Sequence, residues 1–253
     1  MPDTEINNPI GVPFIEIYSL DSTNNYAMQQ VQKGMAQHGA AYFAHEQYAG
    51  KGQRGKQWYS KPGENIALSV VLNTSRLQVS KQFGLSMTIA MVVHDFFSRY
   101  SPGNTFVKWP NDLYYGDRKA GGILIENIIR GKDWQWAIAG IGININQREF
   151  DPSIPNAVSL KQITGKNYNP VQLAKEICDN LNHRYNHLLK QETKSLLTEY
   201  NAVLYKREQS IKLRKDTVLF EAVLKGVNEH GQLVIEAGVE QTYDVGEIEW
   251  VVI

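Results

Sequence analysis

The chain has 253 residues, 42% of them hydrophobic, and its 26 Lys and Arg residues are balanced by 26 Asp and Glu residues. The balanced charge disfavours a protein whose main partner is DNA or RNA, because phosphate binding normally demands a basic surplus. A single cysteine, Cys178, excludes an intrachain disulfide and a cysteine-built zinc site. Without a signal-peptide pattern or a membrane-length apolar run, we expect a soluble cytoplasmic protein.

The first hundred residues predict strands separated by two helices. A strand at Ile15–Tyr18 precedes a helix that Ser22 or Thr23 can cap and that ends near Gly34. Residues 47–57 combine three glycines and three cations without periodicity, which indicates a loop. The remaining elements of this half are strands at Ala40–His45 and Asn65–Leu72 and a helix at Lys81–Tyr100.

The middle of the chain is rich in predicted strands joined by short turns. Hairpins in sequence favour a mixed or antiparallel sheet over a doubly wound one. A polar loop at 146–156 separates these strands from two helical segments. The strands are Thr105–Trp109, Asp112–Tyr115, Gly122–Ile129 and Trp134–Ile145, and the helices are Pro170–Lys190 and Glu192–Val203.

After about residue 206 the pattern changes to strands alone. Their spacing is typical of a small barrel appended to a larger domain, so we predict domains at 1–205 and 206–253. The predicted strands are Ser210–Leu213, Thr217–Val227, Gln232–Glu236, Gln241–Val245 and Glu249–Ile253.

The strongest chemical signal is the loop Gly50–Lys56, whose glycines and cations suit an anion. A flexible basic surface loop would have the same composition. The spacing also approaches a P-loop, but Gln57 stands where a hydroxyl should hold Mg²⁺. The proline and glycine that soon follow would prevent the required helix, so a P-loop is disfavoured.

Three further segments could carry chemistry. Lys108–Leu113 contains Pro-Asn-Asp, which bends a strand and presents polar side chains, although turn formation alone would also explain it. Lys119 leads into glycines at a strand start, where an ammonium can meet a closely approaching ligand. Gly140–Asn146 ends a strand with glycines and Asn144, an amide able to read an adenine edge or simply to form a turn.

Together and in chain order, these segments resemble the biotin protein ligases, that is, biotin–[acetyl-CoA-carboxylase] ligases. The resemblance extends from about residue 15 to the C-terminus, and it rests on residues 22–24, 47, 50–58, 108–112, 118–123 and 140–144. It implies an α+β fold with a mixed, largely antiparallel sheet and helices on one face. This is the class II aminoacyl-tRNA synthetase-like catalytic domain of biotin ligases, followed by a C-terminal SH3-like β-barrel.

The resemblance implies an enzyme that first joins biotin to ATP, giving biotinyl-5′-AMP and pyrophosphate. It then transfers biotin to a lysine of a biotin carboxyl carrier domain of a carboxylase, releasing AMP. Mg²⁺ would accompany the ATP, and no protein-only metal site is expected. The resemblance leaves a monomer and a homodimer open, and it implies neither a membrane nor a DNA partner. Only about 14 residues precede the first strand, so we expect no operator binding.

The resemblance also assigns roles to residues. Lys119 and Arg54 correspond to catalytic positions, and Gln53 departs from the arginine that some members carry, so its role in retaining the adenylate is open. The positions matching biotin contacts are Ser22, Thr23, Asn24, Gln47, Gly50, Lys51, Gly52, Gln53 and Lys119. Those matching nucleotide contacts are Arg54, Lys56, Trp58, Asn111, Asp112 and Asn144.

Two alternatives remain open from the sequence. A lipoate or octanoate ligase or transferase would share the fold and the use of a lysine, but its arginine- and glycine-rich signature is absent. A biotin- or adenylate-sensing regulator would need a DNA-binding module, which the sequence does not show.

Overall fold

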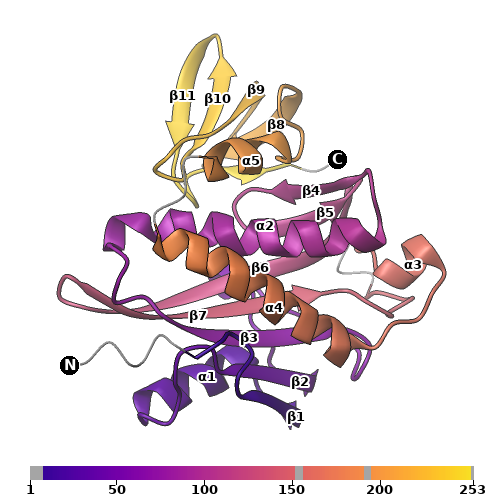
Figure 1. Ribbon diagram of the computed structural model, residues 1–253. Helices are drawn as coiled ribbons and strands as arrows, with labels where there is room; N and C mark the ends of the chain where they lie inside the picture. The colour runs from indigo at the N-terminus through magenta and orange to yellow at the C-terminus, as the bar shows by residue number, and fades with distance from the viewer. Residues whose placement is uncertain (1–7, 152–155, 191–194, 252–253) are drawn as a thin grey trace.

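The computed structural model describes residues 8–151, 156–190 and 195–251. The larger of its two sheets has seven strands in the order β1-β2-β3-β7-β6-β5-β4 (Figure 1). β1 (Phe14–Leu20) is parallel to β2 (Ala41–Gln47), and every other neighbouring pair is antiparallel. The predicted mixed sheet is therefore confirmed. Its other strands are β3 (Ile66–Asn73), β4 (Thr105–Lys108), β5 (Asp112–Tyr115), β6 (Arg118–Arg130) and β7 (Asp133–Ile143).

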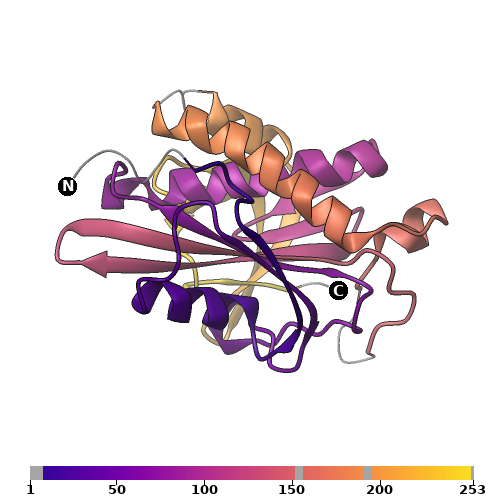
Figure 2. The same cartoon turned by 60° about the horizontal axis from the view of Figure 1, so that its bottom comes forward.

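Helices cover both faces of this sheet. α2 (Gln82–Tyr100) and α4 (Pro170–Leu189) lie together on one face, and α1 (Thr23–Gln32) lies on the other (Figure 2). Side chains of β3 alternate between the two sides: Val70 joins the core under α2 and α4, whereas Val71 packs in a cluster with Ala27 of α1. The α+β class is confirmed, but the expectation that all helices share one face is wrong for α1. A strand buried on both faces reads as the continuous apolar run seen at β3.

The helices depart from the prediction in three places. Ser22 occupies the N-cap position of α1 but makes no side-chain capping bond, and α1 ends at Gln32. A short helix, α3 (Leu160–Thr164), was not predicted, although Ser159 and Gln162 form a capping box at its start. α5 (Leu196–Ala202) lies inside the predicted helix at 192–203, whose first residues, 192–194, fall outside the described part of the chain.

The second sheet is antiparallel and lies beside the β4–β5 edge of the first (Figure 1). Its strand order is β11-β10-β9-β8-β12, as expected for an appended β unit. The predicted last strand ends at Trp250, and residues 252–253 lie outside the described residues. The domain boundary at 205/206 stays a prediction. The strands are β8 (Ser210–Lys215), β9 (Val218–Val227), β10 (Leu233–Ala237), β11 (Val239–Tyr243) and β12 (Glu249–Trp250).

The two sheets are joined by specific contacts. The indole Nε1 of buried Trp109 donates to Gly231 O at 2.9 Å, in the turn before β10. Asn201 of α5 both accepts from Val227 N and donates to Val227 O, at 2.8 and 2.9 Å. These bonds fix the C-terminal sheet over the end of β4. Among the described helices, none has the length and apolar character needed to cross a bilayer.

Candidate functional site

A cavity of about 880 Å³ lies between the α1 face of the large sheet, the loop at 50–57 and the C-terminal sheet. Segments far apart in the sequence meet there. Gly50 is the one residue of the predicted site that does not line it; a Cβ at this position would lie 2.4 Å from Trp58 O, so Gly50 permits close backbone contact. The predicted residues that do line it are Ser22, Thr23, Asn24, Gln47, Lys51, Gly52, Gln53, Arg54, Lys56, Trp58, Asn111, Asp112, Lys119 and Asn144.

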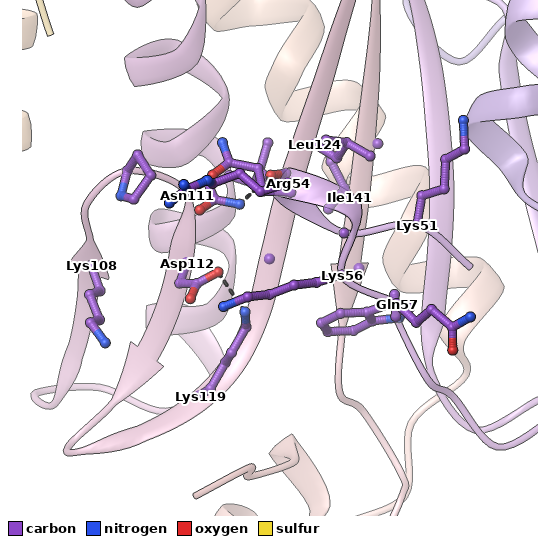
Figure 3. A pocket seen from close by; sticks show the side chains of 18 of the residues that line it. Lys51, Arg54, Lys56, Gln57, Lys108, Asn111, Asp112, Lys119, Leu124 and Ile141 are labelled. Carbon is purple, nitrogen blue, oxygen red and sulfur yellow. Dashed lines mark hydrogen bonds and ion pairs between the residues drawn. The ribbon is translucent and has the colours of Figure 1, made fainter. Parts of the chain in front are cut away.

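One end of the cavity is centred on an ion pair. Lys119 Nζ lies 2.6 Å from Asp112 Oδ1, and both side chains are partly exposed. Lys56 also extends toward this carboxylate from the loop (Figure 3). Gly122, opposite Asp112 in the β5–β6 register, keeps the space beside the pair open. Several cations thus surround one carboxylate, leaving positive charge for an anionic ligand.

Lys108 is a buried cation that the sequence analysis did not place in the site. It lines the same cavity, is 7% exposed, and donates to Tyr114 OH at 3.1 Å. Its ammonium also lies over the rings of Tyr114 and Trp250, 4.8 and 5.1 Å from their centres. Burial lowers the pKa of Lys108 to about 8. The sequence signal that could have identified Lys108 as a buried cation is its place at the end of a largely apolar predicted strand.

The loop at 50–57 is an ordered turn. Gly52 N donates to Lys56 O at 2.7 Å, and Trp58 N donates to Gly50 O at 2.9 Å. These amides therefore serve the turn itself rather than standing free for an anion. Arg54 adopts a left-handed backbone conformation, with φ of 55°. A Cβ at Gly246 would meet the Arg54 guanidinium carbon at 3.4 Å, so Arg54 rests against the C-terminal sheet's last turn.

The C-terminal sheet contributes further residues to the cavity that sequence reasoning missed. Arg214 of β8 and Glu249 of β12 line it and form an ion pair at 3.2 Å. Trp250 lines it as well. Because these residues follow the last strand of the larger sheet by about 70 to 110 positions of sequence, only the packing of the two sheets reveals their place.

The opposite end of the cavity carries neutral polar groups. Thr23 N donates to Gln47 Oε1 at 2.7 Å, which ties the start of α1 to the end of β2. Buried Asn24 donates to Glu126 Oε2 at 2.8 Å and accepts from Ser69 Oγ at 2.6 Å. Ser69 and Glu126 were not singled out in the sequence. Each is a polar residue on the α1 face of a largely apolar strand.

Two glycines of β7 let side chains reach the floor of the cavity. A Cβ at Gly140 would lie 2.4 Å from Asn24 Oδ1, and one at Gly142 would lie 2.6 Å from the Trp58 ring. The sequence predicted a close approach at these glycines, and the structure shows protein side chains making it. The glycines thus position Asn24 and Trp58.

Two predicted amides hold the backbone around Lys119 in place. Asn144 Nδ2 donates to Val158 O at 3.1 Å, and Asn111 Nδ2 donates to Ile123 O at 2.7 Å. Lys119 N donates to Asn156 O at 2.6 Å. The end of the predicted loop at 146–156 therefore runs beside Lys119, and its Phe150 lines the cavity; residues 152–155 lie outside the described residues.

No cluster of three or more His, Cys, Asp or Glu side chains suited to a metal ion occurs among residues 8–151, 156–190 and 195–251. Two carboxylates among the described residues line the cavity, and both are paired with cations: Asp112 with Lys119, and Glu249 with Arg214.

Comparison with known proteins identifies a family. The profile described as the Biotin/lipoate A/B protein ligase family matches residues 16–144, about half of the chain. These residues contain every predicted site residue.

Curated relatives match over part of their length. The "Bifunctional ligase/repressor BirA" of Escherichia coli (strain K12) is 36% identical over 137 residues, 54% of this chain and 42% of that protein. The "Biotin--[acetyl-CoA-carboxylase] ligase" of Paracoccus denitrificans is 31% identical over 157 residues, 59% of this chain and 63% of that protein. The matched region thus spans less than half of the first of these relatives.

Solved structures show the same fold along nearly the whole chain. The biotin protein ligase from Aquifex aeolicus in complex with biotin and ATP has a TM-score of 0.79 at 24% identity, covering 94% of this chain and 97% of that one. The biotin protein ligase from Leishmania major in complex with biotinyl-5-AMP has a TM-score of 0.61 at 22% identity, covering 94% and 98%.

Proposed function

The chain belongs to the biotin/lipoate A/B protein ligase family, and from this premise we propose that it activates biotin with ATP and transfers it to a carrier protein. The curated relatives include ligases named for biotin and acetyl-CoA carboxylase. The observation that carries the proposal is the division of the cavity: neutral polar groups at Thr23 and Gln47 occupy one end, and the Lys119–Asp112 pair with its surrounding cations occupies the other.

This division suits biotin. Its cyclic urea needs neutral hydrogen-bonding groups, which Ser22, Thr23 and Gln47 supply, and its apolar rings can pack on Leu124 and Ile141. Asn24 holds this part of the cavity in place through its bonds to Glu126 and Ser69. The loop residues Lys51, Gly52 and Gln53 cover the ligand, and Gly50 allows the close backbone contact with Trp58 that shapes this loop. The carboxylate of the valeryl chain would reach Lys119.

The cationic end suits ATP. Arg54 and Lys56 bind the phosphates, and Mg²⁺ arriving with the nucleotide offsets their charge. The Trp58 ring offers a flat surface for adenine, and Asn144 Oδ1 can accept from its amino group while Nδ2 holds Val158. Asn111 supports the strand beneath, and Asp112 orients Lys119.

In the first step a biotin carboxylate oxygen attacks the α-phosphorus of ATP. The bond between that phosphorus and the bridging oxygen breaks, and pyrophosphate leaves with the electron pair. Carboxylate and triphosphate repel each other, and Lys119 and Arg54 lower that cost as charge shifts onto the bridging oxygen. These two side chains are the proposed catalytic residues.

In the second step the neutral amine of a carrier lysine attacks the acyl carbon of biotinyl-5′-AMP. An amide forms, the acyl–phosphate bond breaks, AMP leaves, and the amine gives up a proton. We propose a biotin carboxyl carrier domain as the acceptor, in keeping with the names of the relatives. ATP and a carboxylase partner favour a cytoplasmic location.

Pyrophosphate exchange into ATP tests the first step directly. The protein should catalyse exchange with biotin, and lipoate at equal concentration should support little. Labelled biotin should then enter a purified biotin carboxyl carrier domain and leave a carrier whose target lysine is replaced by alanine unmodified. Exchange with lipoate alone would overturn the assignment in favour of the lipoate branch of the family.

We also propose that this chain does not bind an operator. Its 26 basic and 26 acidic residues give no surplus of positive charge for a DNA backbone. A mobility-shift measurement at physiological salt, with and without biotin and ATP, should show no retarded DNA. A retarded complex combined with failure to modify any carrier would favour a sensing regulator.

A further inference from the structure

A continuous line of polar contacts leads from Glu126 on β6 to Thr23 in the cavity. Glu126 Oε2 lies 2.8 Å from Asn24 Nδ2, and Asn24 Oδ1 lies 2.6 Å from Ser69 Oγ. Ser69 Oγ in turn lies 2.7 Å from Thr23 Oγ1. Asn24, Ser69 and Thr23 are buried, with exposures of 3%, 0% and 4%. Water therefore cannot freely exchange partners along this line.

Counting protons constrains the directions of these bonds. An ionised carboxylate only accepts, so Asn24 must turn its amide nitrogen toward Glu126 and its oxygen toward Ser69. Ser69 has one hydroxyl proton, and Asn24 Oδ1 takes it. The Thr23 proton must then serve the 2.7 Å contact between Thr23 and Ser69.

Gln47 Oε1 is a second acceptor within reach of that proton, 3.1 Å from Thr23 Oγ1. Its Oε1 accepts from Thr23 N at 2.7 Å, whereas Thr23 Oγ1 lies farther away, at 3.1 Å. The contact from Thr23 Oγ1 to Ser69 Oγ, at 2.7 Å, has the better hydrogen-bond length, so we assign the Thr23 proton to it. The hydroxyl oxygen of Thr23, which lines the cavity, is thereby left as an acceptor.

We propose that Glu126 is a positioning residue that sets this pattern, so that Thr23 accepts from a ligand bearing an N–H group. The inference rests on the proposed function and deepens it. A cyclic urea carries two N–H donors, whereas the dithiolane ring of lipoate carries none. Glu126 touches neither ligand, and it acts only through Asn24 and Ser69.

Glu126 also lies 3.6 Å from Lys51 Nζ, so the test must separate this ion pair from the bond to Asn24. Glu126→Gln removes the charge but keeps an oxygen that accepts from Asn24. Glu126→Leu removes both. Pyrophosphate exchange would give KM for biotin and for ATP, with thermal unfolding as the check on folding.

We expect Glu126→Leu to raise KM for biotin by about tenfold, the effect of one misdirected buried hydrogen bond. KM for ATP should change by less than about threefold. Glu126→Gln should keep KM for biotin within about threefold of the starting protein. Equal damage by the two variants would assign the effect to the Lys51 pair and overturn the inference, as would an unchanged KM for biotin in Glu126→Leu.

An exchange of the two partners provides a second test. Asn24→Asp alone sets two carboxylates against each other and should weaken biotin binding strongly. Adding Glu126→Gln should restore much of it, because the introduced amide donates to the introduced carboxylate, whose other oxygen still accepts from Ser69. A double variant as weak as Asn24→Asp would contradict the proposed direction of the bonds.

The inference and the proposed function fail in different ways. If the unaltered protein shows no biotin-dependent exchange, the proposed function is wrong. If it exchanges normally and the Glu126 variants behave alike, only the role of Glu126 is wrong. Calorimetric titration with biotin alone separates binding from chemistry in either case.

Discussion

Lys119 Nζ lies 2.6 Å from Asp112 Oδ1, across the hairpin that joins β5 to β6. The carboxylate holds the ammonium at the wall of the cavity before any ligand arrives. An incoming carboxylate and an α-phosphate can then share a cation whose position is already set, which reduces the reorganisation needed in the transition state. We therefore propose that Asp112 positions Lys119 for this chemistry.

Replacing Lys119 tests this arrangement first. Lys119→Ala should lower the rate of biotin-dependent pyrophosphate exchange by about two orders of magnitude or more, because it removes charge stabilisation in the transition state. The side chain is one-third exposed and its pair is near the surface, so the midpoint of thermal unfolding should change little. Near-normal exchange would remove Lys119 from the mechanism.

Asp112→Asn supplies a milder matched change. The amide keeps the shape of the side chain but holds the ammonium less firmly, so kcat should fall while KM for biotin changes less. Steady-state exchange assays at varied biotin concentration would give kcat and KM for biotin separately. A larger loss than in Lys119→Ala would mean that Asp112 itself acts on the reacting groups.

The glycines of β7 offer a matched pair of substitutions. Gly142→Ala places a Cβ 2.6 Å from the Trp58 ring, and Gly140→Ala places one 2.4 Å from Asn24 Oδ1. Each alanine must displace its neighbour. Gly142→Ala should raise KM for ATP by about tenfold, and Gly140→Ala should raise KM for biotin by a similar factor.

Steady-state exchange kinetics on both variants would check this division of the cavity, with circular dichroism confirming that each variant folds. If both Michaelis constants rose together in each variant, the two glycines would not separate a nucleotide end from a biotin end.

Lys108 should make stability depend on alkaline pH. Burial lowers its pKa from 10.5 to about 8 in the folded chain, so between these values the unfolded chain binds the proton more readily. Below pH 8 the folded protein bears the full free-energy cost of burying a charged Lys108. As the pH rises toward 10.5, Lys108 loses its proton in the folded state and that cost disappears. Relative to Lys108→Met, the native protein should therefore gain unfolding free energy between pH 7 and pH 10. Urea titrations at several pH values measure the difference in unfolding free energy between the two proteins. A difference that does not change with pH would contradict a buried Lys108 with a lowered pKa.

His38 should contribute to destabilisation by acid. It is 3% exposed, its Nδ1 accepts from Asn73 N at 3.1 Å, and burial lowers its pKa from 6.5 to about 4. The unfolded chain is protonated first as the pH falls, so unfolding free energy drops between pH 6.5 and 4, by up to about 3 kcal/mol. His38→Asn keeps an acceptor but does not titrate. Denaturant unfolding across this range should show a shallower pH dependence in the variant; parallel curves would assign the acid loss elsewhere.

Much of the site was visible in the sequence because it lies in local patterns. The loop at 50–57, the Pro-Asn-Asp bend and the glycines at 140 and 142 each break a regular period, and the structure brings them to one cavity. Glu126 and Ser69 were missed because each sits in an otherwise regular strand. A single polar residue on a strand face acquires meaning only when the groups opposite it are known.

The sequence by itself determined the alternation of strands and helices, the change to β structure after residue 206 and the chemical character of the loops, since these follow from short-range periodicity and turn residues. Tertiary structure alone decided that α1 crosses to the other face, that Arg214 and Trp250 reach the cavity, and that Lys108 is buried against an aromatic ring 142 positions away. Such contacts join distant segments through packing of two sheets, and no local pattern encodes which sheet face or edge will meet another.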